Sequence, residues 1–497
     1  MFAISQNGCR IKARIIIEEV LIMFPSKHSS CTTILVGKNA TYDGSTIIAR
    51  NEDAGEAVHP KKFVVLHHED QPRHYQSKLS KFSLDLPDNP VRYTSVPDVA
   101  VDEGVWGEAG ININNIAMSA TETITTNSRV LGADPFVKNG FGEEDLLTIT
   151  LPYIKSAREG VKRVGQLLKK YGTYEPNGII FSDVNEIWYM ETAGGHHWVA
   201  QRIPDDAYVI APNQTGIQEV KFDDPDNFMF PKDLLKFVQQ NHLNLTENFN
   251  FRKIFGSDTQ SDHHYNTPRA WYGQRYLSPS AVKDKTPMSN DLSFINYADH
   301  KITIEDIKYI LSSHYQDTPY DPFTPGANSQ TSPYRPIGFN RNQELSLLQI
   351  RPYVQANHAA IQWLAFAENP FNTLTPFYTN VLDTPDCYRD TTKILDSHNA
   401  YWANRLISLI VADHYQELMA DVETYQQATL AYGHQRIAKV DKAVENKQDS
   451  ALMQALSQAN ERTADRIMKD TEELLTKLVI KASENSRGAF TNGHSHY

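Results

Sequence analysis

Three residues that could support nucleophilic chemistry lie in one short stretch near the start of the chain. Residues 31–53 have the sequence CTTILVGKNATYDGSTIIARNED, which contains Cys31, Arg50 and Asp53. A guanidinium beside a thiol favours the thiolate, and the thiolate is the form of cysteine that attacks a carbonyl carbon. These residue types therefore predict an activated cysteine, provided that the fold brings them together.

The same stretch has the pattern of a β-hairpin. Two β-branched and apolar runs, residues 32–36 and 46–50, are separated by turn-forming residues. In an antiparallel pair, the end of the second strand lies beside the start of the first. We therefore expect Arg50 and Asp53 within contact range of Cys31. An ordinary buried strand cysteine is the alternative that the residue type alone favours.

The proton acceptor for the thiol is predicted to be the α-amine of Cys31 itself. Ser29 and Ser30 precede the cysteine, and small residues before a nucleophile favour cleavage of the Ser30–Cys31 bond. Cys31 would then begin the mature chain. Its free α-amine, with a usual pKa of about 8, could accept the thiol proton near neutral pH. Asp53 would orient that amine.

With these residues, the chain resembles the dipeptidase A-type cysteine peptidases of the N-terminal-nucleophile (Ntn) hydrolase superfamily. The resemblance covers most of the chain after Cys31. Beyond the stretch at 31–53, it is carried by the segments SATET (119–123), NSRVLGADPFV (127–137), GEEDLLTITLPYIKSAREGVKRVG (142–165), NEIWYMETAGGHHWVAQRIPDD (185–206) and APNQ (211–214). The related bile-salt and penicillin acylases share only a sparser pattern, which is matched by Cys31, Arg50, Asp53 and Asn213.

The resemblance implies a cysteine dipeptidase that hydrolyses short peptides of varied side chain through a thioester on Cys31. Its implied catalytic residues are Cys31, Arg50, Asp53 and Asn213. Asn213 follows an expected strand at 208–211 and a proline, so it is a candidate donor to the oxyanion, although a turn-forming Asn is the alternative. Two other functions stay open: a non-peptide amide hydrolase of the bile-salt or penicillin acylase type, and a catalytically inactive binding protein of the same fold.

Thr121 and Glu122 are the predicted substrate-binding residues. They end an expected strand, and a solvated strand end is the alternative interpretation. The preceding turn, Asn112–Asn115, replaces an Asn-Glu-x-Gly turn of related enzymes. The free amine of a dipeptide could pair with a carboxylate, for which Glu122 or Asp53 is the best candidate. An N-acetylated dipeptide would leave that buried carboxylate without its partner and should be a poor substrate.

The pattern of strands and helices predicts an α+β fold. Apolar residues at helical spacing over 143–168 predict two helices divided by Pro152. These helices lie between two groups of short β-branched runs that predict strands. Such an order favours layers of sheet and helix, and the resemblance implies a four-layer αββα sandwich. From residue 390 to 481 the composition turns to Ala, Leu, Glu, Gln and Lys, which predicts an added C-terminal helical region.

We divide the chain into four parts. These are a leader or propeptide (1–30), an Ntn-hydrolase catalytic domain (31–389), the C-terminal helical region (390–483) and a flexible tail (484–497). Residues 1–22 are interpreted as an untranslated leader, because Glu18-Glu19-Val20 can be encoded by a purine-rich ribosome-binding sequence shortly before Met23. A secretory signal is the alternative, but the two glutamates interrupt its apolar segment.

Composition favours a soluble cytoplasmic enzyme. A length of 497 residues with 40% hydrophobic content allows a large core, and a net charge of −12 argues against nucleic-acid and anionic-membrane partners. The sparse cysteines, Cys9, Cys31 and Cys387, give no disulfide framework and fit a reducing compartment. We expect small peptide substrates and a homo-oligomer.

No cofactor or metal is expected. Adjacent histidines on a strand point to opposite faces, and the sequence contains no His-Glu-x-x-His motif. The pairs concerned are His67-His68, His196-His197 and His263-His264.

Overall fold

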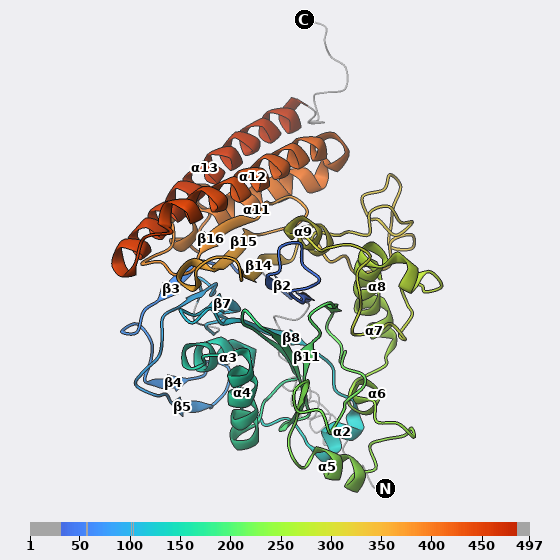
Figure 1. Ribbon diagram of the computed structural model, residues 1–497. Coiled ribbons are helices and arrows are strands. Elements are labelled where there is room, and N and C mark those ends of the chain that lie inside the picture. Colours follow the sequence, from blue (N-terminus) through green and yellow to red (C-terminus); the bar gives the residue numbers. More distant parts are fainter. Residues whose placement is uncertain (1–30, 56–57, 101, 103, 485–497) are drawn as a thin grey trace, which may run out of the picture.

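The computed structural model describes residues 31–55, 58–100, 102 and 104–484. The predicted leader (1–30) and residues 485–497 of the predicted tail lie outside the described residues. Two six-stranded antiparallel sheets form the centre of the described part. In Figure 1 the C-terminal helices lie on one side of these sheets, and the helices α3 and α4 lie on the other.

The first sheet is built around the predicted hairpin. Its strand order is β12-β1-β2-β14-β15-β16. The bounds are β1 Thr32–Val36, β2 Thr46–Asp53, β12 Tyr208–Ala211, β14 Asn342–Ile350, β15 Ala360–Phe366 and β16 Thr375–Tyr378. Thr33 pairs with Arg50 across the hairpin, and Ser346 pairs with Arg50 on the other side. Residues from distant parts of the chain therefore meet at β2.

The second sheet has the order β13-β11-β10-β9-β8-β7. Its bounds are β7 Ala109–Ile111, β8 Ala117–Thr123, β9 Asn177–Ser182, β10 Ile187–Ala193, β11 His197–Ile203 and β13 Phe228–Met229. Local turns connect most of these strands, so this sheet follows the chain order more closely than the first.

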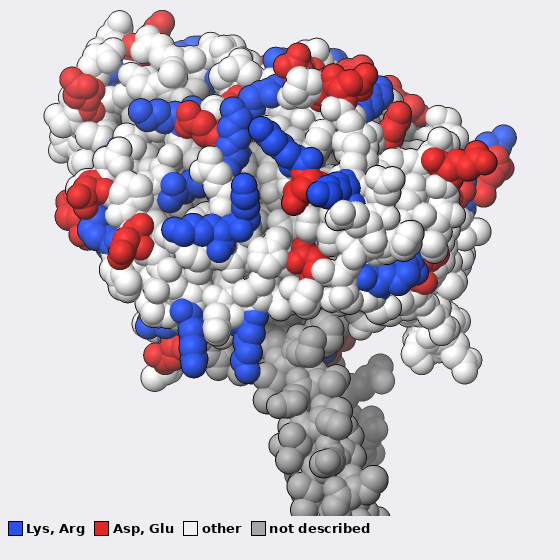
Figure 2. Space-filling model, turned by 90° about the horizontal axis from the view of Figure 1, so that it is seen from below, with Lys and Arg blue, Asp and Glu red and all other residues white. Residues whose placement is uncertain are grey.

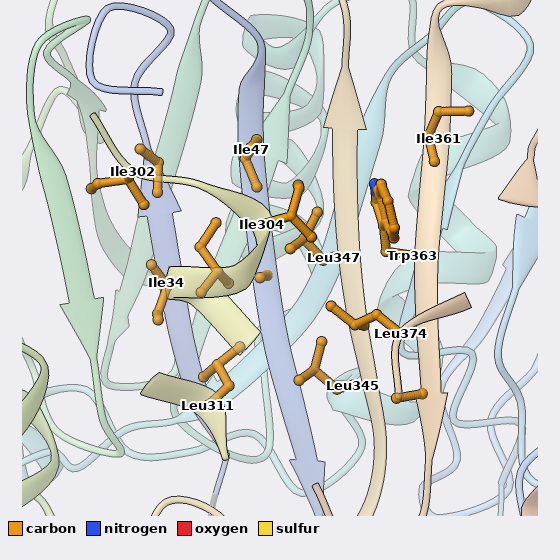
Figure 3. Close-up of a cluster of buried hydrophobic side chains, with 14 of the residues drawn as sticks. Ile34, Ile47, Ile302, Ile304, Leu311, Leu345, Leu347, Ile361, Trp363 and Leu374 are labelled. Carbon is orange, nitrogen blue, oxygen red and sulfur yellow. The ribbon is translucent and has the colours of Figure 1, made fainter. Parts of the chain in front are cut away.

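Alternate side chains of the hairpin enter two different cores, as the period of a strand requires. Leu35 and Ile48 share one cluster with Ile180 and Tyr189 of the second sheet. Side chains on the opposite face, such as Ile34 and Ile47, share another cluster with Ile304 and Leu311 of α9 (Ile304–Leu311). Figure 3 shows α9 lying across this face. The first sheet therefore has the second sheet on one face and helices on the other.

The helices α3 (Glu143–Thr150) and α4 (Ala157–Tyr171) cover the second sheet. A short 3-10 turn at Leu151–Tyr153 separates them. This turn contains Pro152, so the predicted division of the helical pattern is confirmed. Proline lacks the N–H that would continue the helix.

The C-terminal helical region is confirmed, but it begins later than predicted. Its helices are α11 (Ala400–Asp413), α12 (Tyr415–Val444) and α13 (Asp449–Glu484). Residues 390–399 are not helical, because this segment is rich in Asp, Thr, Ser and Asn, which favour turns and caps over helix interiors. Val440 and Leu456 pack with Trp363 of the first sheet, so the long helices belong to its core.

The remaining elements are short. Two small sheets pair β3 with β6 and β4 with β5. The bounds are β3 Val64–Leu66, β4 His74–Gln76, β5 Ser83–Asp85, β6 Tyr93–Ser95, α2 Ser128–Ala133, α5 Leu234–Gln240, α6 Phe251–Phe255, α7 Gln260–Tyr265, α8 Thr267–Leu277, a 3-10 turn at Pro279–Val282, another at Ala356–His358, and α10 Asp386–Arg389.

The surface carries charges of both signs. On the face seen from below in Figure 2, Lys and Arg side chains gather across the middle and acidic side chains lie mainly toward the edges. The middle of this face therefore carries mainly basic side chains. In the described part of the chain, the helices are too short or too polar for any to cross a membrane.

Candidate active site

Cys31 and Arg50 meet at the open end of the hairpin. Cys31 directly precedes β1 and is 3% exposed, and Arg50 on β2 is 1% exposed. The Nη2 group of Arg50 donates a hydrogen bond to Cys31 Sγ at 2.7 Å. The contact predicted between these two residues is present. A guanidinium in this position favours the thiolate.

Two buried glutamates hold the guanidinium beside the sulfur. Arg50 Nη1 donates to Glu108, and Nη2 donates to Glu143 Oε1 at 2.8 Å. Burial alone would lower the pKa of Arg50, but the negative charges of Cys31, Glu108 and Glu143 outweigh it and raise the pKa well above its ordinary value. Arg50 therefore stays positively charged throughout the physiological pH range.

Sequence reasoning missed both glutamates. Glu143 is the first residue of α3, and the sequence explains an acidic residue there as a favourable helix start. Glu108 precedes β7 and has a φ of 57°, which no local pattern indicates. Only the contacts made in the folded chain show that these two carboxylates lie beside Arg50.

More buried carboxylates lie near this group. Lys61 forms ion pairs with Glu52 at 2.7 Å and with Asp98 at 2.8 Å. The backbone N–H of Glu143 donates to Glu175 at 2.6 Å, and burial raises the pKa of Glu175 to about 7. The surroundings of Cys31 and Arg50 are therefore rich in buried carboxyl groups.

Asn213 is joined to the cysteine through a buried arginine, Arg269. Arg269 Nη1 donates to the carbonyl oxygen of Cys31 and, at 2.9 Å, to Thr32 Oγ1, while Nη2 donates to Asn213 Oδ1 at 2.7 Å. Because the guanidinium needs an acceptor, it fixes which way the amide of Asn213 points. The Nδ2 atom of Asn213 is buried and has no hydrogen-bond partner among the described residues. The role of Asn213 as an oxyanion donor stays a prediction.

Sequence reasoning also missed Arg269. It lies on α8 and is fully buried. Its segment, NTPRAWYGQRYL (266–277), is aromatic-rich, and this composition predicts a segment that packs over the sheet. The arginine also donates to Asn266 Oδ1 and to the carbonyl of Tyr265, each at 2.7 Å. The available signal was an arginine within an aromatic-rich segment, although the segment also contains Arg275.

Asp53 ends β2 and is fully buried. It accepts hydrogen bonds from Arg335 and Asn342. Burial raises the pKa of Asp53, although its contact with Arg335 opposes this effect. Successive strand residues alternate faces, so the Asp53 side chain leaves β2 on the opposite face from Arg50. Its role in orienting the α-amine of Cys31 stays a prediction.

Thr121 and Glu122 lie on β8, where the backbone of Glu122 pairs with Gly178. Their side chains are outside the described part of the structure, so their substrate-binding role stays a prediction. The preceding turn does join β7 to β8. Its Asn115 has a φ of 57°, a left-handed conformation that Asn tolerates better than most residues.

The described residues contain no group of three or more His, Cys, Asp or Glu side chains that could hold a metal ion. The histidines of one adjacent pair, His196 and His197, do not point away from each other but contact the same carboxylate. His196 Nδ1 and His197 Nδ1 contact the two oxygens of Asp134 at 2.8 and 2.7 Å. This contact ties the β10–β11 turn to Asp134.

Comparison with known proteins assigns the family. The profile of peptidase family C69 matches residues 30–428. The chain is 49% identical to "Probable dipeptidase A" of Streptococcus pyogenes over 93% of its own length and 98% of that protein. It is also 49% identical to "Dipeptidase" of Bifidobacterium longum, over 92% and 91% of the two chains. The identity to "Dipeptidase A" of Lactobacillus helveticus is again 49%, over 91% and 97%. The chain therefore belongs to peptidase family C69.

Proposed function

We propose that the protein is a cysteine dipeptidase that hydrolyses short peptides through Cys31. The observation that carries this proposal is the 2.7 Å hydrogen bond from Arg50 to the sulfur of Cys31 in a buried, charged site. The relatives named as dipeptidases share nearly half of their residues with the chain over more than nine-tenths of its length. Peptides are thus the favoured substrates over the amides of the bile-salt or penicillin acylases.

The proposed reaction begins with hydrolysis of the Ser30–Cys31 bond, in which water supplies the new Ser30 carboxylate oxygen and the α-amine of Cys31 is freed. This amine takes the thiol proton, and the thiolate attacks the carbonyl carbon of the substrate. Asn213 Nδ2 donates to the oxyanion of the tetrahedral intermediate. When the intermediate collapses, the peptide C–N bond breaks, and the leaving amine receives its proton from the α-ammonium of Cys31.

The second half of the reaction releases the acyl group. Water attacks the thioester and gives its proton to the α-amine of Cys31. The C–S bond then breaks, which releases the acid product and restores the thiolate. Arg269 positions Asn213 and the Cys31 backbone through hydrogen bonds to both. Asp53 is assigned to hold the α-amine.

The finer architecture and the domain limits are part of this proposal. We assign the two sheets with helices on both outer faces to the four-layer αββα sandwich of Ntn hydrolases. Three hydrophobic cores support the assignment: one contains side chains of both sheets, one lies between the first sheet and α9, and one lies between the second sheet and α4. The limits are a removed leader (1–30), a catalytic domain (31–389), a C-terminal region (390–483) whose helices begin at Ala400, and a tail (484–497). We also assign the protein to the cytoplasm, which the sparse cysteines support, and we expect no nucleic-acid partner, because the net charge is acidic. A homo-oligomer stays an expectation.

A pair of cysteine variants tests the proposed function. Cys31→Ala should abolish hydrolysis of alanyl-alanine and should leave the chain unprocessed. Cys387→Ala is the matched control, since it removes the other cysteine of the described chain and should leave activity unchanged. Retained hydrolysis by the purified Cys31→Ala protein would overturn the proposal. Equal loss in both variants would point to a folding defect instead, which circular dichroism would reveal.

A further inference from the structure

Glu143 lies within reach of the bond that Cys31 would attack. Its Oε1 atom and Cys31 Sγ both contact the same nitrogen, Arg50 Nη2, at 2.8 and 2.7 Å. These two atoms are therefore at most the sum of two hydrogen-bond lengths apart. In a dipeptide, the free α-nitrogen is two bonds from the carbonyl carbon that the sulfur attacks. A substrate bound for attack can therefore place its α-nitrogen within the range of Glu143.

The charge balance of the region favours binding of a cation. Arg50 contacts both Glu108 and Glu143, and Lys61 contacts both Glu52 and Asp98. The four carboxylates of these two groups exceed their two cations. Such an excess is costly in a buried site. Burial, together with the charge of Glu108, raises the pKa of Glu52 well above its ordinary value, so Glu52 tends to hold a proton and offsets part of this excess. An ammonium group on the substrate would supply positive charge.

We propose that Glu143 is a specificity-determining residue that binds the free α-ammonium group of the substrate. This inference rests on the proposed dipeptidase function, and it explains why the substrate should be an unblocked peptide. The enzyme would then act on the first peptide bond of a chain, because only there is the α-amine next to the attacked carbonyl. Peptides with a blocked amine would leave Glu143 facing an uncharged group.

Glu143 fits this role better than the other carboxylates near Cys31. Glu108 contacts Arg50 Nη1, which is not the nitrogen that binds the sulfur. Asp53 has one oxygen bound by Arg335 and the other by Asn342, and it leaves β2 on the opposite face. Glu122, the candidate from the sequence, provides a direct competing hypothesis.

The test compares two substrates that differ only at the α position. These are alanyl-alanine and N-lactoyl-alanine, in which a hydroxyl replaces the α-amine. The wild-type enzyme should prefer alanyl-alanine in kcat/KM by roughly a hundredfold or more, because the hydroxyl cannot form the ion pair that the α-ammonium group forms with the buried carboxylate. Equal rates on the two substrates in the wild type would overturn the proposal without any variant being needed.

The preference should depend on Glu143 in particular. Glu143→Gln keeps the side-chain shape but removes the charge, and the preference for alanyl-alanine should fall by about tenfold or more. Glu108→Gln is the matched control, because it also removes one carboxylate partner of Arg50. Its absolute rates should fall, since Arg50 is disturbed, but its preference should stay close to that of the wild type.

Three further outcomes would contradict the proposal. One is an active Glu143→Gln enzyme with the wild-type preference. Another is a preference that falls equally in Glu143→Gln and Glu108→Gln, which would mean that both act only through Arg50. The third is a preference that is lost in Glu122→Gln and kept in Glu143→Gln, which would assign the amine to Glu122. None of these affects the dipeptidase proposal, because that proposal fails only if the Cys31→Ala enzyme retains activity.

Discussion

The two cysteines of the described chain lie in opposite electrostatic environments. Cys31 precedes β1 and receives a hydrogen bond from the Arg50 guanidinium. Cys387 lies on α10, where burial, followed by the charges of Asp465 and Glu461, raises the pKa of its thiol to about 12. Both side chains are largely shielded from water, so burial alone does not separate them. The neighbouring charge decides which sulfur can react.

The largest expected difference between the two regions is in alkylation. Iodoacetamide at neutral pH should modify Cys31 of the mature enzyme and abolish its activity, while Cys387 stays unmodified. The sign follows from the raised pKa: the Cys387 thiol stays protonated at neutral pH and forms thiolate only as the pH approaches about 12. Peptide mapping by mass spectrometry should therefore find Cys387 labelling only in alkaline solution or in denatured protein. Faster labelling of native Cys387 than of Cys31 at pH 7 would break the comparison.

A smaller effect, on the rate of hydrolysis, is expected from substitution of Asn213 in the Cys31 site. Asn213→Ala removes the proposed oxyanion donor and should lower kcat by roughly a hundredfold to a thousandfold. The iodoacetamide reactivity of Cys31 should change little, because Arg50 still contacts the sulfur. Steady-state kinetics and alkylation rates on the same preparation measure both effects. If alkylation slows as much as hydrolysis does, Asn213 acts on the thiol and not on the oxyanion.

The parts of this site that sequence reasoning predicted are the parts built by neighbouring residues. The hairpin at 31–53 is local, so its runs, its turn and its antiparallel register place Arg50 beside Cys31. The helical pattern divided at Pro152 was equally local. Both predictions depend on strand and helix periods alone, which the sequence displays directly.

The parts that sequence reasoning missed are brought in by long-range packing. Arg269 reaches the Cys31 carbonyl from α8, and Glu108 reaches Arg50 from the segment before β7. The residue pattern within each of these segments does not indicate which other part of the chain the segment contacts. Asp53 shows a second limit: the hairpin pattern did not indicate that Arg335 and Asn342, from a distant part of the chain, donate hydrogen bonds to its side chain. Contact partners of this kind become visible only when the sheets are assembled.

The most direct test of the account is the intact mass of the purified, active protein. If Cys31 acts as an N-terminal nucleophile, the mass must correspond to a chain that begins at Cys31. This result does not depend on whether translation starts at Met1 or at Met23. The Cys31→Ala protein should keep the residues that precede position 31. A fully active enzyme whose mass still includes residues before Cys31 would contradict the account, because the cysteine would then have no free α-amine to accept its proton.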